Sequence, residues 1–152
     1  MSENIEPKNV IETLEKLVDF LRDSHAGFTE IGKHIKDDSA RLFFMQETQV
    51  RAEYAGELEN ELHRLGVKDV KQSGMVSGKT HRAWGELKAK LGGGDHTLLA
   101  TAEQGEDAAK AAYEAALEEH LPRDVREVLL AQFAHIKSAH DVVKALRDRP
   151  AA

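Results

Sequence analysis

Two glutamates stand where the apolar stripes of predicted helices should continue. Apolar residues at alternating spacings of three and four predict a helix over residues 99–116. Its inward positions are Leu99, Ala102, Glu106, Ala109, Tyr113 and Ala116. A second stripe reads Phe43, Glu47, Val50, Tyr54, Leu58, Leu62 and Leu65. A carboxylate at a core position is costly unless it is paired, hydrogen-bonded or bound to a metal. Glu47 and Glu106 are therefore the leading candidates for a functional site.

Other polar residues are predicted at the same depth of the four long helices. His25 and Glu47 are equally far from the predicted corner at Lys36, and Glu106 lies at the same distance from the helix start near Asp95. The last helix brings polar residues to this level as well. The complete set of candidate metal ligands is Glu47, Glu106, His140, Glu103, His25, His135 and Gln132. Carboxylate and imidazole ligands suit iron, manganese or zinc, and no organic cofactor is predicted.

The expected site is mononuclear or incomplete. Glu47 and Glu106 would be the anionic ligands. Nitrogen would come from His140 or His135 and from His25, while Glu103 and Gln132 would be further ligands or partners of ligands. A di-iron site of the ferritin type needs two Glu-x-x-His motifs. None of the eight histidines has a glutamate three residues before it, the nearest match being Gln132-x-x-His135.

Ordinary salt bridges are the alternative interpretation of the two glutamates. Glu47 and Glu106 could pair with Arg51, Arg22 or Lys137. The polar layer would then fix the helix register of a non-catalytic structural or interaction bundle.

The histidines and tyrosines have structural alternatives too. His25, His135 and His140 could each be a hydrogen-bonded histidine at the boundary of the core. Tyr54 and Tyr113 are expected to pack with their hydroxyls at the polar layer. No catalytic residue, reaction or small-molecule substrate is assigned from the sequence.

Composition limits the class of protein. The chain has 152 residues, a formal net charge of −6 and no cysteine. Disulfides and thiolate metal sites are thereby excluded, and the absence of a basic patch argues against a nucleic-acid partner. No apolar run is long enough to span a membrane and residues 1–7 lack a signal pattern, so we expect a cytoplasmic protein.

The helix pattern predicts an all-α fold. Long helices are expected over about 7–35, 38–65, 95–120 and 122–149, with a short one within 79–91. Two tight turns and one long connection predict a ferritin-like up-down-down-up four-helix bundle. The whole chain, 1–152, is one domain, with residues 1–6 flexible and 67–94 forming the crossover.

Particular segments add a resemblance to this prediction. They are Leu65-Gly66, His81-Arg82-Ala83-Trp84 with Leu87-Lys88, Gly93-Gly94-Asp95, Glu103-x-Gly105-Glu106-Asp107-Ala108-Ala109 with Tyr113, and Gln132, Ile136-Lys137 and His140-Asp141. Together they resemble a family of small bacterial proteins assigned to the ferritin-like superfamily, over about Val10 to Arg147. The resemblance implies a ferritin-like bundle in a bacterial cytoplasm and no established activity. A metal site would suggest metal handling or stress response, as in the iron stores, peroxidases and DNA-protecting cages of the wider superfamily.

Dimerisation is a further expectation. Phe20, Phe44 and Phe133 do not all fit the inner stripes, so at least one is predicted to face a partner in a homodimer.

Overall fold

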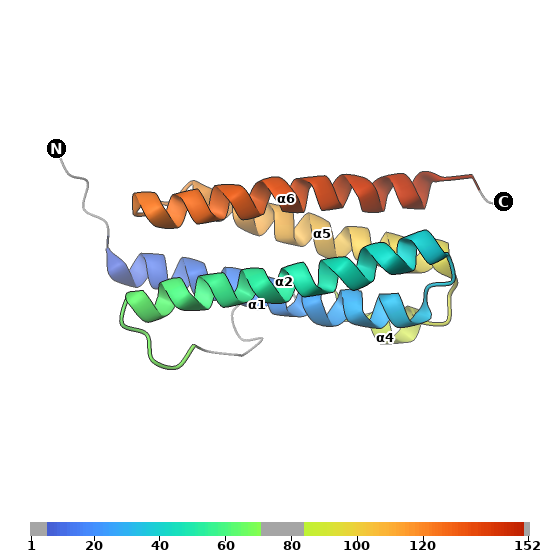
Figure 1. The fold of residues 1–152 in the computed structure, drawn as a ribbon, viewed down its shortest axis with the longest axis horizontal. Coiled ribbons are helices and arrows are strands. Elements are labelled where there is room, and N and C mark those ends of the chain that lie inside the picture. Colours follow the sequence, from blue (N-terminus) through green and yellow to red (C-terminus); the bar gives the residue numbers. More distant parts are fainter. Residues whose placement is uncertain (1–5, 71–83, 151–152) are drawn as a thin grey trace.

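The described part of the protein is entirely helical. The computed structural model describes residues 6–70 and 84–150. These residues form five helices and no strand: α1 (Pro7–His34), α2 (Asp38–Arg64), α4 (Leu87–Lys90), α5 (Asp95–Leu117) and α6 (Arg123–Asp148). The four long helices lie side by side (Figure 1). The predicted all-α class is confirmed, and of the short helix predicted within 79–91, residues 79–83 lie outside the described residues.

The corner between α1 and α2 is joined to the start of α5. The Asp37 carboxylate caps α2 by accepting the backbone N–H of Ala40 at 2.8 Å. The Asp95 carboxylate accepts the backbone N–H groups of Lys36 and Asp37, at 2.8 and 2.9 Å. Asp95 is the first residue of α5, and the N-cap position before it is Gly94 at a φ of 89°. The long connection therefore returns the chain to the end of the bundle where α1 stops (Figure 1).

Asp37 should make the stability depend on pH at the acid end. Hydrogen bonds from Ser39, Ala40 and Arg149 lower the pKa of Asp37 from 3.8 to about 2. Because the folded value lies below the unfolded one, the stabilisation is complete above about pH 4 and is lost as the pH falls toward 2. We expect the difference in unfolding free energy between wild type and Asp37→Asn, measured with urea, to shrink from pH 5 to pH 2. A difference that stays constant over this range would contradict the assignment.

The helices pack in pairs around two apolar clusters. α1 packs on α2 and α5, while α6 packs on α5 and contacts α2 less extensively. One cluster includes Leu14, Leu58 and Leu129, and the other includes Phe28 and Leu98. The charged candidates of α2 and α5 fall between the residues that these helices contribute to the two clusters. The core is therefore interrupted at mid-height by a polar layer.

The burial of α5 agrees with its predicted stripe. All six of its predicted inward positions are buried, including Glu106 and Tyr113. The predicted stripe of α2 is only partly confirmed. Glu47, Leu58 and Leu62 are buried as predicted, but at three other positions the buried residue is the next one along the chain. The positions predicted inward and found half-buried are Phe43, Val50, Tyr54 and Leu65; the buried residues that follow the first three are Phe44, Arg51 and Ala55. A search for apolar residues at helical spacing does not select Arg51. This arginine is buried because neighbouring carboxylates compensate its charge.

The phenylalanines that suggested a dimer are packed within the chain. Phe20 and Phe44 are buried. Phe133 is half-buried and stacks on Tyr113 at 6.2 Å between ring centroids. The argument for a homodimer from these residues is therefore removed.

Trp84 packs against two glycines of neighbouring helices. A Cβ atom added at Gly27 of α1 or at Gly105 of α5 would overlap the Trp84 indole. The Trp84 ring also meets Phe28 edge to face at 5.6 Å. The glycines thus make room for the Trp84 side chain, which packs the connection against α1 and α5.

This packing predicts opposite effects for two glycine-to-alanine substitutions. Gly105→Ala should lower the free energy of unfolding by about 1–3 kcal/mol because the indole must shift. Gly56→Ala is the matched control, since a Cβ at Gly56 in α2 meets nothing within 4 Å. It should raise stability by up to about 1 kcal/mol through helix propensity. Urea unfolding measures both; equal effects would contradict the packing.

Candidate metal centre

A buried guanidinium holds the two central glutamates together. Arg51 is fully buried, and its Nη1 and Nη2 atoms donate to the two carboxylate oxygens of Glu106 at 2.6 and 2.8 Å. Its Nη2 atom also lies 3.3 Å from Glu47 Oε2. The Phe28 ring lies 5.0 Å from the guanidinium carbon. Of the salt bridges considered from the sequence, the one to Arg51 is the one observed.

The charges of this centre compensate one another. Burial alone would lower the pKa of Arg51, but the Glu106 carboxylate and then that of Glu47 raise it above its ordinary value. The side chain therefore stays charged in the interior. Its two parallel hydrogen bonds to Glu106 form a bidentate pair, the strongest arrangement for these groups.

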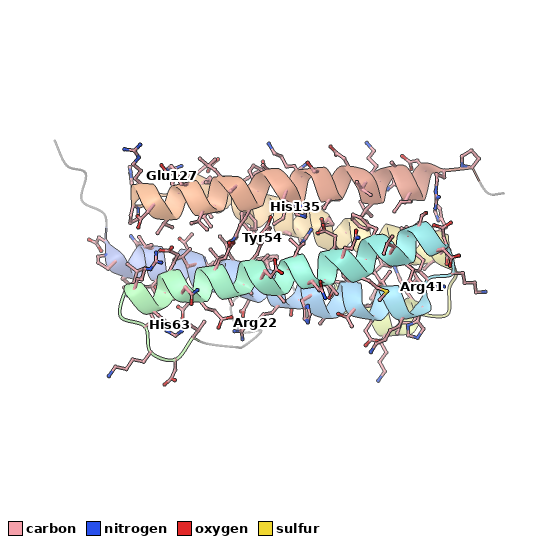
Figure 2. The ribbon with its side chains drawn as sticks, in the orientation of Figure 1. Arg22, Arg41, Tyr54, His63, Glu127 and His135 are labelled. Atoms are coloured by element: carbon pink, nitrogen blue, oxygen red, sulfur yellow. The ribbon has the colours of Figure 1, made fainter. Side chains whose placement is uncertain are left out.

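Histidine 135 extends the centre toward α6. The second oxygen of Glu47 lies 2.6 Å from His135 Nε2, and the Tyr54 ring meets the imidazole edge to face at 5.7 Å. Figure 2 shows Tyr54 and His135 in the space between α2 and α6. Both Glu47 oxygens thus have partners, one on its own helix and one on α6.

Tyr113 and Gln132 form a second buried pair. The Tyr113 hydroxyl donates to Gln132 Oε1 at 2.6 Å, and Gln132 Nε2 donates to Glu57 Oε1 at 2.8 Å. Burial raises the pKa of Tyr113 far above its ordinary value, so the hydroxyl remains a donor. Both the oxygen and the nitrogen of the Gln132 amide are therefore hydrogen-bonded within the bundle.

A different group of side chains has the spacing of metal ligands. Glu103 and Asp107 on α5 and His140 on α6 place one ligand atom each within 4.8 Å of one another. Residues four apart share a helix face, which brings the two carboxylates to α6. His140 is 9% exposed, and its Nε2 atom lies 2.7 Å from Asp107 Oδ1. Within residues 6–70 and 84–150, no other group of three such residues meets this spacing.

Neighbouring charges also contact this group. Glu103 forms an ion pair with Arg147, whose Nη2 atom lies 2.9 Å from Asp148. The Nδ1 atom of His140 lies 3.4 Å from Asp141. Asp107 is exposed, so the group is open to solvent on one side.

The seven predicted ligands therefore fall into separate groups. Glu103 and His140 belong to the α5–α6 group. Glu47, Glu106 and His135 lie around Arg51, and Gln132 bonds to Tyr113. His25 is exposed and lies outside the core, with its Nδ1 atom 2.8 Å from the Thr48 carbonyl oxygen.

Arg51 was named from the sequence only as an alternative salt-bridge partner of the two glutamates, and Asp107 was not named as a candidate ligand. Arg51 follows Glu47 by four residues, and Asp107 follows Glu103 by four. That i to i+4 spacing was the available signal in both cases, because it places each pair on one helix face.

The fold and these contacts define an all-helical bundle with a charged, internally paired centre. The chain belongs to the family described as Domain of unknown function (DUF2383), whose model matches residues 9–119. The match includes Glu103 and Asp107 and ends before α6, which carries His140. A search of curated proteins finds no match to this chain. Among the described residues, no helix combines the length and apolar character required to cross a membrane.

Proposed function

We propose that this protein is a ferritin-like four-helix bundle that binds one divalent metal ion through Glu103, Asp107 and His140. The observation that carries the proposal is the spacing of the three ligand atoms, all within 4.8 Å of one another. The ferritin-like assignment is supported by four long helices with a polar layer between them and by the connection that returns to the α1–α2 corner.

The donor set fits a first-row metal. One imidazole nitrogen and two carboxylate oxygens suit iron, manganese or zinc. The Nε2 atom of His140 already faces Asp107, so an ion between them would replace the hydrogen bond that joins them. The Nδ1–H group would then point toward Asp141, the arrangement that usually orients a ligating histidine. Three protein ligands leave coordination positions for water or another ligand.

The central glutamates are a poorer place for the ion. Arg51 supplies the positive charge that Glu106 and Glu47 require, through a bidentate contact. A metal ion there would have to displace a fully buried guanidinium, which would then lack a partner. We therefore place the ion between α5 and α6 rather than beside Arg51.

Elemental analysis tests the proposal. Protein without a histidine tag would be purified, in the absence of chelators, from cells supplied with iron and manganese. We expect close to one metal ion per chain in wild type, loss of that metal in His140→Ala and its retention in His25→Ala, the control at an exposed histidine. Wild type without metal, or equal metal in wild type and His140→Ala, would refute the site. Redox-active iron or manganese would justify tests of metal handling and of peroxide-stress functions.

The second candidate function is a structural or interaction bundle without metal. It is favoured by the internal pairing of Arg51 with Glu106 and Glu47, which is a register-fixing polar layer in its own right. Metal-free protein that takes up no iron(II) under anaerobic conditions would support this candidate.

A further inference from the structure

A groove that includes the proposed ligands Glu103 and Asp107 is also lined by one basic residue from α4 and one from α6. It has a volume of about 330 Å³. Its walls are formed by Lys90, Ala100, Thr101, Glu103, Gln104, Asp107 and Arg147. Lys90 comes from α4 and Arg147 from α6, while the remaining five residues belong to α5. The groove thus brings two carboxylates and two cations to one place.

Without a metal ion, carboxylates already neutralise both cations. Arg147 is paired with Glu103 and with Asp148, and Lys90 lies 3.4 Å from Glu86. The contacts of Asp148 and Glu103 also raise the pKa of Arg147. An anion entering the groove would meet no uncompensated positive charge.

A divalent ion would change this balance by adding its own charge and by releasing Arg147 from Glu103. Lys90 would keep Glu86 and Arg147 would keep Asp148 as partners. Coordination by Glu103 and Asp107 would cancel the charge of both carboxylates and draw Glu103 away from Arg147. Arg147 and Lys90 would then face an ion with open coordination positions. A bound metal is often the largest charge in a site and attracts anions toward it.

We propose that this groove binds a phosphate group, and that it does so only when the metal site is filled. The inference rests on the proposed metal function. One phosphate oxygen would occupy an open position of the ion, the Arg147 guanidinium would hold two others, and Lys90 would contribute a point charge. A tetrahedral anion can meet three cations on three sides, which a planar carboxylate does less well. Thr101 and Gln104 line the space left for the rest of a small phosphate ester.

Thermodynamic linkage provides the test. The free Mn²⁺ concentration would be measured by electron paramagnetic resonance during titration of the protein, in the presence and absence of inorganic phosphate, with a protein-free reference. We expect phosphate to strengthen Mn²⁺ binding by about tenfold, a typical coupling between two ligands. Phosphate affinity measured by calorimetry should rise by the same factor when Mn²⁺ is added, because coupling is reciprocal.

Matched lysine variants show which surface is responsible. Lys90→Gln should reduce the factor by which phosphate strengthens Mn²⁺ binding, with each variant compared against its own Mn²⁺ affinity in the absence of phosphate. Lys88→Gln, on the same short helix and outside the groove, should behave as wild type. An unchanged phosphate effect in Lys90→Gln would overturn the inference, as would equal enhancement by acetate.

The two proposals fail in different ways. Mn²⁺ binding that phosphate does not strengthen overturns the phosphate site and leaves the metal site standing. Absence of Mn²⁺ binding under all conditions overturns the metal site, and the phosphate site with it.

Discussion

Replacing Arg51 with methionine is expected to lower the free energy of unfolding by about 3–5 kcal/mol. Methionine keeps much of the length of the side chain but carries no charge. The carboxylate of Glu106, fully buried, would lose both hydrogen bonds from the guanidinium, and Glu47 would lose its contact as well. An unpaired charge in the interior is among the most costly defects a core can carry. Urea unfolding at pH 7 measures the change.

Two further variants distinguish charge from packing. Arg22→Met is the matched control, because Arg22 pairs with Glu59 while both side chains remain partly exposed. It should cost less than about 1 kcal/mol. Adding Glu47→Gln and Glu106→Gln to Arg51→Met should recover much of the loss, since no charge is then buried. If Arg51→Met were no more costly than Arg22→Met, the central ion pair would not stabilise the bundle.

Divalent metal should stabilise the wild-type protein strongly. An ion that binds only the folded state contributes about 2.7 kcal/mol when present at a hundred times its dissociation constant. For a chain of this size, that corresponds to a rise of about 5–10 °C in melting temperature. Thermal unfolding with added Mn²⁺ or Zn²⁺, followed by circular dichroism, measures the rise.

Substitutions in the two polar groups locate the ion. Asp107→Asn should remove the metal-induced rise because it removes a ligand beside His140. Glu47→Gln should preserve the rise, because Glu47 lies with Arg51 and His135 in the other group. The reverse result would move the ion to the centre of the bundle and contradict the α5–α6 site.

The course of the helices could be predicted because it depends on local pattern. The complete apolar stripe predicted over residues 99–116 is buried in α5. The displacement in α2 has a tertiary cause. Arg51 becomes an interior residue only because Glu106, 55 positions later, supplies the opposite charge. The periodicity of apolar residues within one helix cannot predict a partner on a distant helix.

The candidate site was predicted in part for the same reason. Glu106 at a core position was a sound signal of a buried polar layer, and its partner there is a guanidinium. Glu103 and His140 were named as candidate ligands, but Asp107 was not. Asp107 is exposed, and its place beside His140 depends on how α5 and α6 face each other. His25 was placed at the right depth but on the wrong side of α1, whose neighbouring inward positions are Ser24 and Gly27.

The position of a bound ion is the most direct test of the central claim. Crystals grown with Mn²⁺ would be measured for anomalous scattering at a wavelength where manganese contributes. We predict one strong peak per chain at coordination distance from His140 Nε2 and from carboxylate oxygens of Asp107 and Glu103, with Arg51 still bound to Glu106. A peak between Glu47, Glu106 and His135, or no peak in protein saturated with Mn²⁺, would contradict the proposed site.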